Sequence, residues 1–309
     1  MNKAPMNRSI MLSDEEIGDY AERCINLNAP ASEEQVIGHT INQDLFDVIG
    51  FLPAESVDLM FIDPPYNLTK TFKSSKFSRT SIDAYSEYID SWLSRLIRLL
   101  KPNASVYICG DYLSSTSIHL TAGKYLRLRN RITWQREKGR GAMKNWKNSS
   151  EDIWFFTNSD EYKFYVDRVK EKRFVLAPYR IDGKPKDWQQ DEDGRFRLTH
   201  PSNIWTDLSV PYWSMPENTE HPTQKPEKLL AKIILAGSDE GDVIFDPFLG
   251  SGTTSVTAKK LGRRYYGVEL DRHYAALTEK RLEMADDNKK IQGYSDGVFW
   301  ERNSLRYQK

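Results

Sequence analysis

An apolar run that ends abruptly in an acid and two prolines constrains the fold of this chain more than any other feature. In SVDLMFIDPPYN the apolar part shows no alternation with polar residues, which is typical of a strand buried on both faces of a parallel sheet. Pro64 and Pro65 have no amide hydrogen for a neighbouring strand, so the strand must end there. Asp63 is therefore predicted to lie at the carboxyl edge of the sheet, where open α/β sheets bind their ligands.

The segments on either side alternate between strand and helix patterns. An amphipathic stretch over 84–100 is followed by the strand-like ASVYICG, so the first run begins a βαβ unit. The same rhythm returns after residue 226 with a helix, the strand VIF, a Gly-rich loop, a helix, the strand RRYYGVEL and a last helix. Between about 158 and 220 the sequence is polar, aromatic and turn-rich. We therefore predict an α/β fold, a doubly wound Rossmann-like sheet with a smaller insert.

Composition narrows the class of protein. A mean hydropathy of -0.65 with 28% charged residues is ordinary for a soluble globular chain, and no apolar run reaches membrane-spanning length. The amino-terminal residues lack the apolar core of a secretion signal. The two cysteines, Cys24 and Cys109, have no metal-ligand spacing. We therefore expect a cytoplasmic protein with no metal and no membrane contact.

Basic residues concentrate in one segment, although the chain as a whole has no net charge. Between Lys124 and Lys147 there are nine basic residues and a single acid, Glu137. Such asymmetry is typical of a site for a polyanion in an otherwise neutral protein. A solvated basic face is the alternative interpretation.

The segment GDVIFDPFLGSGTT resembles the first βα turn of a nucleotide-binding sheet. Gly250 and Gly252 stand between a short strand and a helix, and Glu269 ends the next strand, where a carboxylate can bind a ribose hydroxyl pair. Thr253 follows the second glycine where a triphosphate-binding loop needs Lys. Asp246 would repel a phosphate. These residues favour a cationic nucleoside such as S-adenosylmethionine, which has a ribose, an ammonium and a sulfonium but no phosphate.

The acid and prolines of DPPY suit chemistry on a nucleobase amine. Such an amine is a poor nucleophile because its lone pair is delocalised into the ring. Two acceptors, the Asp63 carboxylate and the Pro64 carbonyl, would localise that pair by accepting the amine hydrogens, while Tyr66 stacks on the base. The negative charge and the ring also favour a cationic methyl donor.

Together, FIDPPYN and FDPFLGSGTT resemble the catalytic and cofactor motifs of the DNA amino-methyltransferases, which methylate adenine N6 or cytosine N4. The catalytic motif comes first in this chain, which resembles the beta motif order of that family and its restriction-modification members. HPTQKPEKLLAKIILAGS is similar to the remaining cofactor motif. INQDLFDVIGFLPAESVDL resembles the segment that contacts the cofactor adenine, with Gln43 where a glycine commonly stands. ITWQREKGRGAMKNWKNSSEDIWFFTN resembles the loop and strand beyond the catalytic motif.

The resemblance implies a site for each ligand. The implied catalytic residues are Asp63, Pro64, Pro65 and Tyr66. The implied S-adenosylmethionine residues are Asp44, Asp63, His221, Thr223, Lys225, Asp246, Pro247, Phe248, Gly250, Ser251, Gly252, Thr253 and Glu269. We assign Lys138, Arg140, Lys144 and Lys147 to DNA phosphates, and Trp134 to the core.

The resemblance also gives a function to each part of the chain. Residues 1–35 are a helical extension that starts at the capping box SDEE, 36–157 the catalytic half, 158–220 a target-recognition insert, 221–285 the cofactor-binding half and 286–309 a polar tail without a recognisable pattern.

The implied reaction is methyl transfer from S-adenosylmethionine to adenine N6 in double-stranded DNA, with the base flipped out of the helix. The implied partners besides DNA are a cognate restriction endonuclease and a second copy of the chain, in the bacterial cytoplasm at the nucleoid. Cytosine N4 is the close alternative; in this family an Asp such as Asp63 leans toward adenine and a Ser toward cytosine. A non-catalytic DNA-binding protein and an RNA substrate are further alternatives. Cytosine C5 is disfavoured, because neither ICGD nor ERCIN resembles the nucleophilic cysteine motif that it needs.

Overall fold

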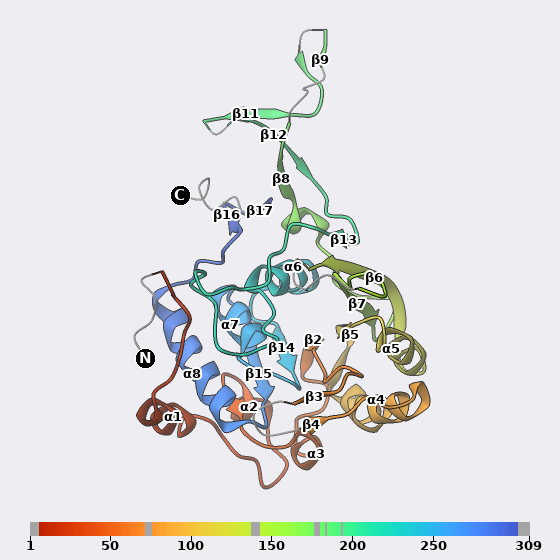
Figure 1. The fold of residues 1–309 in the computed structure, drawn as a ribbon, viewed down its shortest axis with the longest axis vertical. Coiled ribbons are helices and arrows are strands. Elements are labelled where there is room, and N and C mark those ends of the chain that lie inside the picture. Colours follow the sequence, from red (N-terminus) through yellow and green to blue (C-terminus); the bar gives the residue numbers. More distant parts are fainter. Residues whose placement is uncertain are drawn as a thin grey trace.

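A central sheet of eight strands organises the molecule, which this computed structural model describes over residues 6–71, 76–136, 143–175, 180–182, 184–192 and 194–301 (Figure 1). In spatial order the strands are β1 (Thr40–Ile41), β15 (Arg264–Val268), β14 (Val243–Asp246), β2 (Val57–Ile62), β5 (Leu100–Gly110), β7 (Ser150–Thr157), β6 (Arg127–Gln135) and β13 (Ile204–Trp205). The strands from β1 to β5 are parallel, and β7 is antiparallel to both of its neighbours.

Strand β2 confirms that its apolar run is buried on both faces. Every residue of the strand is buried. Met60 and Ile62 pack into one core with α4 (Ile82–Leu96) and α5 (Ser115–Ala122), whereas Leu59 and Phe61 pack into a second core with α6 (Glu227–Gly237). The predicted α/β, doubly wound fold is therefore confirmed.

The strand order brings together two segments that lie far apart in the sequence. Leu59 of β2 pairs with Ile244 of β14, and Met60 pairs with Phe245. From β2 the sheet continues through β5 on one side, and from β14 it continues through β15 on the other. Ligands of open α/β sheets bind at such a switch point, outside the carboxyl ends of the strands.

Three further helices pack against the central sheet and its core. These are α7 (Thr253–Lys260), α8 (Arg272–Asp287) and the short α3 (Leu45–Val48). The first helix, α1 (Asp14–Ala21), has the predicted capping box of Ser13 and Glu16 and packs on α8, with Lys280 Nζ 2.5 Å from Glu16. A one-turn helix, α2 (Glu33–Val36), follows it. No helix in the described ranges is long and apolar enough to cross a membrane.

The insert forms an arm that extends away from the central sheet (Figure 1). After the short 3₁₀ helix Val166–Val169, it contains β8 (Glu171–Phe174), β9 (Arg180–Ile181), β10 (Lys184–Pro185), β11 (Gln189–Asp191) and β12 (Gly194–Thr199). Its strand β13 returns to the central sheet beside β6. At its base Lys232 of α6, which is 2% exposed, lies 2.8 Å from both Glu171 and Asp207.

The carboxy-terminal segment differs from the expectation of a tail without a pattern. Strands β16 (Tyr294–Ser295) and β17 (Val298–Trp300) complete the sheet of the arm, in the order β11-β12-β8-β17-β16. Phe299 of β17 pairs with Glu171 of β8 and is fully buried. Short strands carry little periodicity, so their partner across the sheet, and not the local sequence, decides that they form.

Candidate active site

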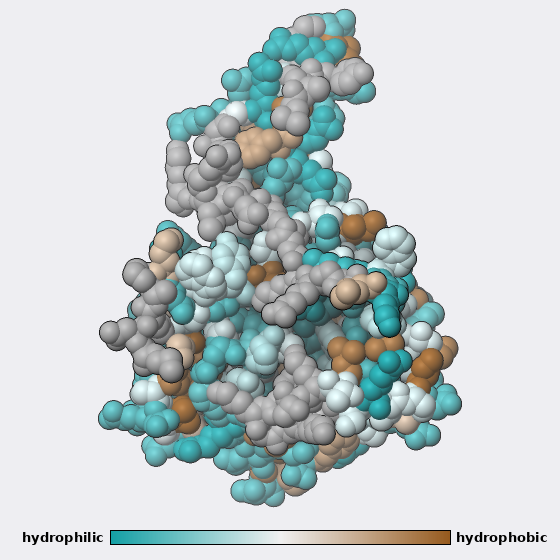
Figure 2. Space-filling view, in the orientation of Figure 1, coloured by the Kyte–Doolittle hydropathy of each residue, from teal (hydrophilic) through white to brown (hydrophobic). Residues whose placement is uncertain are grey.

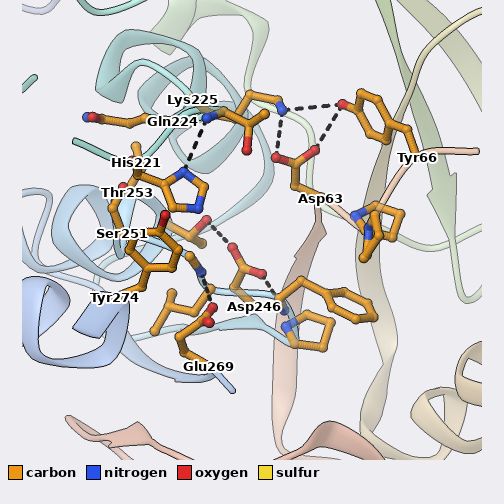
Figure 3. A pocket seen from close by; sticks show the side chains of 18 of the residues that line it. Asp63, Tyr66, His221, Gln224, Lys225, Asp246, Ser251, Thr253, Glu269 and Tyr274 are labelled. Carbon is orange, nitrogen blue, oxygen red and sulfur yellow. Dashed lines mark hydrogen bonds and ion pairs between the residues drawn. The ribbon is translucent and has the colours of Figure 1, made fainter. Parts of the chain in front are cut away.

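A cavity of about 440 Å³ opens at the carboxyl ends of β2, β14 and β15. Its size is that of a small-molecule site. Apart from Gly252, the predicted catalytic and cofactor residues all line it: Asp44, Asp63, Pro64, Pro65, Tyr66, His221, Thr223, Lys225, Asp246, Pro247, Phe248, Gly250, Ser251, Thr253 and Glu269. Figure 3 shows how side chains from both halves of the chain converge on this space.

Asp63 provides the carboxylate on the β2 side of the cavity. Its Oδ1 accepts a hydrogen bond from the Tyr66 hydroxyl at 2.9 Å, and its Oδ2 forms an ion pair with the Lys225 ammonium at 2.6 Å. The side chain is 18% exposed. Both oxygens therefore have a donor, which fixes the orientation of the carboxylate at the edge of the cavity (Figure 3).

Lys225 belongs by sequence to a cofactor motif, but its ammonium contacts the catalytic motif. Its side chain is 7% exposed, and its Nζ also lies 3.2 Å from the Tyr66 hydroxyl and 3.5 Å from Glu151. Burial disfavours the ammonium, yet the nearby Asp63 and Glu151 carboxylates outweigh burial and raise the pKa of Lys225 above its ordinary value. Lys225 is therefore a permanent cation beside Asp63.

Glu151 and Arg136 complete this cluster and were missed by the sequence analysis. Glu151, the second residue of β7, accepts a hydrogen bond from the Tyr66 hydroxyl at 3.3 Å, and its other oxygen is paired with Arg136. Its side chain is 4% exposed. The only signal in the sequence is an acid at the start of the apolar run EDIWFF.

Hydrogen bonds from neighbouring residues fix the conformation of the turn formed by DPPYN. The Asn67 side chain accepts from the Thr80 amide at 2.8 Å and donates to the Thr80 carbonyl at 3.1 Å. The Tyr85 hydroxyl donates to the Pro65 carbonyl at 2.8 Å. The described part of the chain shows no hydrogen bond to the carbonyl of Pro64, which is the second acceptor that the sequence predicts.

Asp246 ends β14 and provides a second carboxylate of a different kind. It is 3% exposed, and its oxygens accept from the Thr254 hydroxyl at 2.5 Å and the Phe248 amide at 2.9 Å. Both donors are neutral. Burial therefore dominates and raises the pKa of Asp246 to about 7, although the two hydrogen bonds act to lower it.

Glu269 follows β15 and occupies the predicted ribose position. One oxygen accepts from the Gly250 amide at 2.7 Å and the other from the Asp271 amide at 2.8 Å. Burial raises the pKa of Glu269 to about 7 against the effect of these backbone donors. Each oxygen keeps a lone pair for a ligand hydroxyl, since a carboxylate oxygen can accept two hydrogen bonds.

The glycines of the loop after β14 are required by their backbone angles and neighbours. Gly250 has φ +57°, and a Cβ there would lie 3.1 Å from His221 Nε2. Gly252 has φ +78°, and a Cβ there would lie 2.4 Å from the Thr278 side chain on α8. Side chains at either position would be strained. Gly252 thus allows α7 and α8 to approach closely but does not line the cavity.

Two further predicted cofactor segments line the cavity. The His221 ring packs edge-on against Tyr274 with centroids 4.4 Å apart, and its Nδ1 accepts from the Thr223 amide at 3.4 Å. Asp44 caps α3 by accepting from the Phe46 amide at 2.8 Å. Gln43, which replaces the common glycine, exchanges two hydrogen bonds with the backbone of Leu27 and thereby anchors the extension. No group of three or more potential metal ligands occurs in the described ranges.

Acids of the protein neutralise much of the predicted basic cluster. Arg127 and Arg129 pair with Asp160, Lys124 with Asp90 and Arg131 with Asp152. Trp134 is 1% exposed in the core, as predicted.

The proposed phosphate contacts divide into two pairs. Lys138 and Arg140 lie outside the described residues. Lys144 and Lys147 are exposed, and Trp146 between them is 93% exposed. This stretch leads directly to Asn148 and Ser150, which line the cavity.

A family model described as DNA methylase, for N6 and N4 methyltransferases, matches residues 57–280. The matched region contains Asp63 with the charged residues around it, the glycine loop after β14, and Glu269. The chain belongs to this family. A type II methyltransferase of Bacillus subtilis, M.BglII, is 31% identical over 82% of this chain and 71% of that protein. The DNA adenine methyltransferase YhdJ of Escherichia coli is 34% identical over 79% of this chain and 82% of that protein.

Solved structures share the fold at lower identity. The cytosine-N4-specific PvuII DNA methyltransferase aligns with a TM-score of 0.59 at 17% identity, over 84% of this chain and 92% of that one. The complex of M1.HpyAVI with S-adenosylmethionine aligns with a TM-score of 0.54 at 22% identity, over 79% of this chain and 98% of that one. The protein therefore has the fold of S-adenosylmethionine-dependent DNA methyltransferases, as the resemblance implied.

Proposed function

We propose that this DNA methyltransferase transfers a methyl group from S-adenosylmethionine to N6 of adenine in double-stranded DNA. The observation that carries the proposal is the meeting of Asp63 and Asp246, from adjacent strands, in one cavity. A carboxylate with a rigid carbonyl beside it thereby faces a buried glycine loop. These two halves suit a base and a methyl donor respectively.

The residues on the β14 side fit S-adenosylmethionine. Asp246 is a buried carboxylate and Glu269 a half-buried one, at neighbouring strand ends, suited to an ammonium and to ribose hydroxyls respectively. Asp44, His221, Thr223, Phe248, Gly250, Ser251 and Thr253 line the rest of this side. When bound, S-adenosylmethionine would supply a methyl group activated by a sulfonium. The chain itself holds and orients both ligands, and we propose no role for a metal.

The residues on the β2 side activate the amine. Asp63 and the Pro64 carbonyl accept its two hydrogens, so that the nitrogen lone pair is directed at the methyl carbon. Transfer would form an N–C bond and break the S–C bond, whose electrons stay on sulfur; the excess proton of the nitrogen would pass to the Asp63 carboxylate and from there to solvent. Tyr66 and Pro65 shape the base site. Asp63 at the first motif position, and the name of the Escherichia coli relative, support adenine.

The proposal places DNA across the mouth of the cavity. The target base must leave the helix to reach Asp63. Lys144 and Lys147 contact phosphates, and Trp146 offers an exposed ring next to them. Figure 2 shows that the described surface of the arm is mainly hydrophilic, as expected for a groove-binding insert. We keep the boundaries 1–35, 36–157, 158–220 and 221–285, but assign β16 and β17 of the carboxy-terminal segment to the arm.

A restriction-modification role follows from the names of the relatives, several of which are type II methyltransferases. A cognate endonuclease, a homodimer and a place at the nucleoid of a bacterial cytoplasm belong to this proposal.

Incubation with labelled S-adenosylmethionine and either mixed-sequence DNA or RNA, followed by mass analysis of the nucleosides, tests it. We expect N6-methyladenine. N4-methylcytosine alone would overturn the choice of base. Label in RNA but not in DNA would overturn the substrate. No methylated nucleoside, together with unchanged DNA binding by Asp63→Ala, would support the non-catalytic alternative.

A further inference from the structure

Four charged side chains balance one another around the Tyr66 hydroxyl. Asp63 and Glu151 are the two acids, and Lys225 and Arg136 are the two bases. Lys225 and Glu151 are 7% and 4% exposed, so neither serves as a solvated surface charge. Removing one member leaves an uncompensated charge in a buried site, which is strongly unfavourable.

The arrangement raises a question about Asp63. In the proposed function its carboxylate must accept a hydrogen from the target amine, yet the Tyr66 hydroxyl and the Lys225 ammonium already donate to its two oxygens. Both donors also have a second acceptor within reach. Glu151 Oε2 lies 3.3 Å from the Tyr66 hydroxyl and 3.5 Å from Lys225 Nζ.

We propose that Lys225 and Glu151 are positioning residues for methyl transfer. Lys225 orients Asp63, and Glu151 takes over hydrogen bonds from Lys225 and Tyr66 when the target amine binds Asp63. This inference rests on the proposed function. It assigns Lys225 to the base side of the cavity and not to the methyl donor.

Other titratable groups face Asp63 from neighbouring strands. Cys109 on β5 is fully buried, and burial raises the pKa of its thiol well above the ordinary value, so it stays neutral. Asp246 faces Asp63 from β14 with a pKa raised to about 7 by burial. Because Asp246 belongs to the proposed donor site, its titration is suppressed by measuring at saturating S-adenosylmethionine.

The test compares Lys225→Met and Glu151→Gln in single-turnover methyl transfer across pH. Each variant is expected to slow transfer by about 100-fold, the usual effect of a misplaced catalytic group. The acid limb should move in opposite directions. Loss of the cation in Lys225→Met should move the limb up, whereas loss of the negative charge in Glu151→Gln should move it down.

Three controls distinguish a positioning role of Lys225 and Glu151 from a general loss of protein stability. Lys225→Arg should recover part of the rate. Lys228→Met removes another buried lysine, which pairs with Asp207 away from the cavity, and should lower the unfolding temperature without moving the acid limb. A double-mutant cycle of Asp63→Asn and Lys225→Met, with the free energy of unfolding measured by urea denaturation, should show that the two changes are not additive.

Distinct results overturn the inference. If Lys225→Met and Glu151→Gln both slow transfer without moving the acid limb of the pH profile, Lys225 and Glu151 have only a structural role. If Lys225→Met weakens S-adenosylmethionine binding while the transfer rate at saturation is unchanged, Lys225 belongs to the donor site. A wild-type protein that methylates no DNA nucleoside overturns the proposed function itself, whereas an active wild type with unshifted variants overturns only this inference.

Discussion

Strands β2 and β14 lie side by side and end in the same way, with an aspartate followed by proline, yet their two carboxylates are held in opposite manners. Asp63 has a cation at 2.6 Å. Asp246 has only a hydroxyl and an amide, and its pKa rises to about 7. The local motif therefore places an acid at the cavity, and the neighbours from other elements decide its charge and its chemistry.

Asp63→Ala should have the largest effect, because it removes the acceptor on which amine activation depends. We expect transfer to slow by about 10²–10³-fold, the usual consequence of losing one preorganised electrostatic group. Single-turnover methylation measures the rate, and isothermal titration measures S-adenosylmethionine affinity. If the affinity for S-adenosylmethionine fell by the same factor as the transfer rate, Asp63 and Asp246 would not have separate roles in transfer and in donor binding.

Asp246→Ala should show the reverse pattern. Loss of a charged hydrogen-bonding partner weakens binding by about 10–100-fold, so the dissociation constant of S-adenosylmethionine should rise while transfer at saturation changes less. The same two assays provide the comparison with Asp63→Ala. A variant with normal affinity and slow transfer would move Asp246 to the base side.

The combined change Lys144→Ala and Lys147→Ala should weaken DNA binding without altering either carboxylate site. The slope of log affinity against log salt should fall by about 2, since each phosphate contact on duplex DNA contributes about 0.9. Fluorescence anisotropy at several salt concentrations measures it. Leu120, an exposed apolar residue on α5, provides a control as Leu120→Ala. An unchanged slope would place the DNA elsewhere.

A smaller effect is expected in the pH dependence of stability without ligand. The pKa of Asp246 is about 7 in the folded protein and about 3.9 in an unfolded chain, so the folded state binds its proton more tightly. The stabilisation from this group is complete below the unfolded pKa and is lost as the pH rises through 7. Relative to Asp246→Asn, the wild type should therefore lose stability between about pH 4 and pH 7 in urea denaturation. A constant difference would contradict the raised pKa.

Much of the fold could be predicted because burial leaves a clear periodic signal. The run VDLMFI predicts a strand covered on both faces, and Ser13 with Glu16 predicts the start of α1. Strands β16 and β17 were not predictable, since two or three residues carry no period; β17 is stabilised by pairing with β8, and β16 by pairing with β17.

The functional site likewise contains residues that the sequence predicted and residues that it did not. Asp63 and Asp246 were found from the sequence because proline and glycine next to them limit the backbone. Glu151 was not found, because an acid at the start of an apolar run is its only signal and does not distinguish it from any other acid at the start of a strand. Lys225 was predicted as a cofactor residue, but its contact with Asp63 could not be predicted, since its own motif says nothing about a partner 162 positions away.

The sequence by itself determined which side chains stand at strand ends, because hydrophobic burial and backbone restriction are local properties that the order of residues records. Tertiary structure alone decided which charges face one another. Lys225 reaches Asp63, and Glu151 reaches Lys225 and the Tyr66 hydroxyl, in a sheet that places β2 between β14 and β5, with β7 next. Electrostatic interaction depends on distance through space and on burial, and neither is contained in the spacing along the chain.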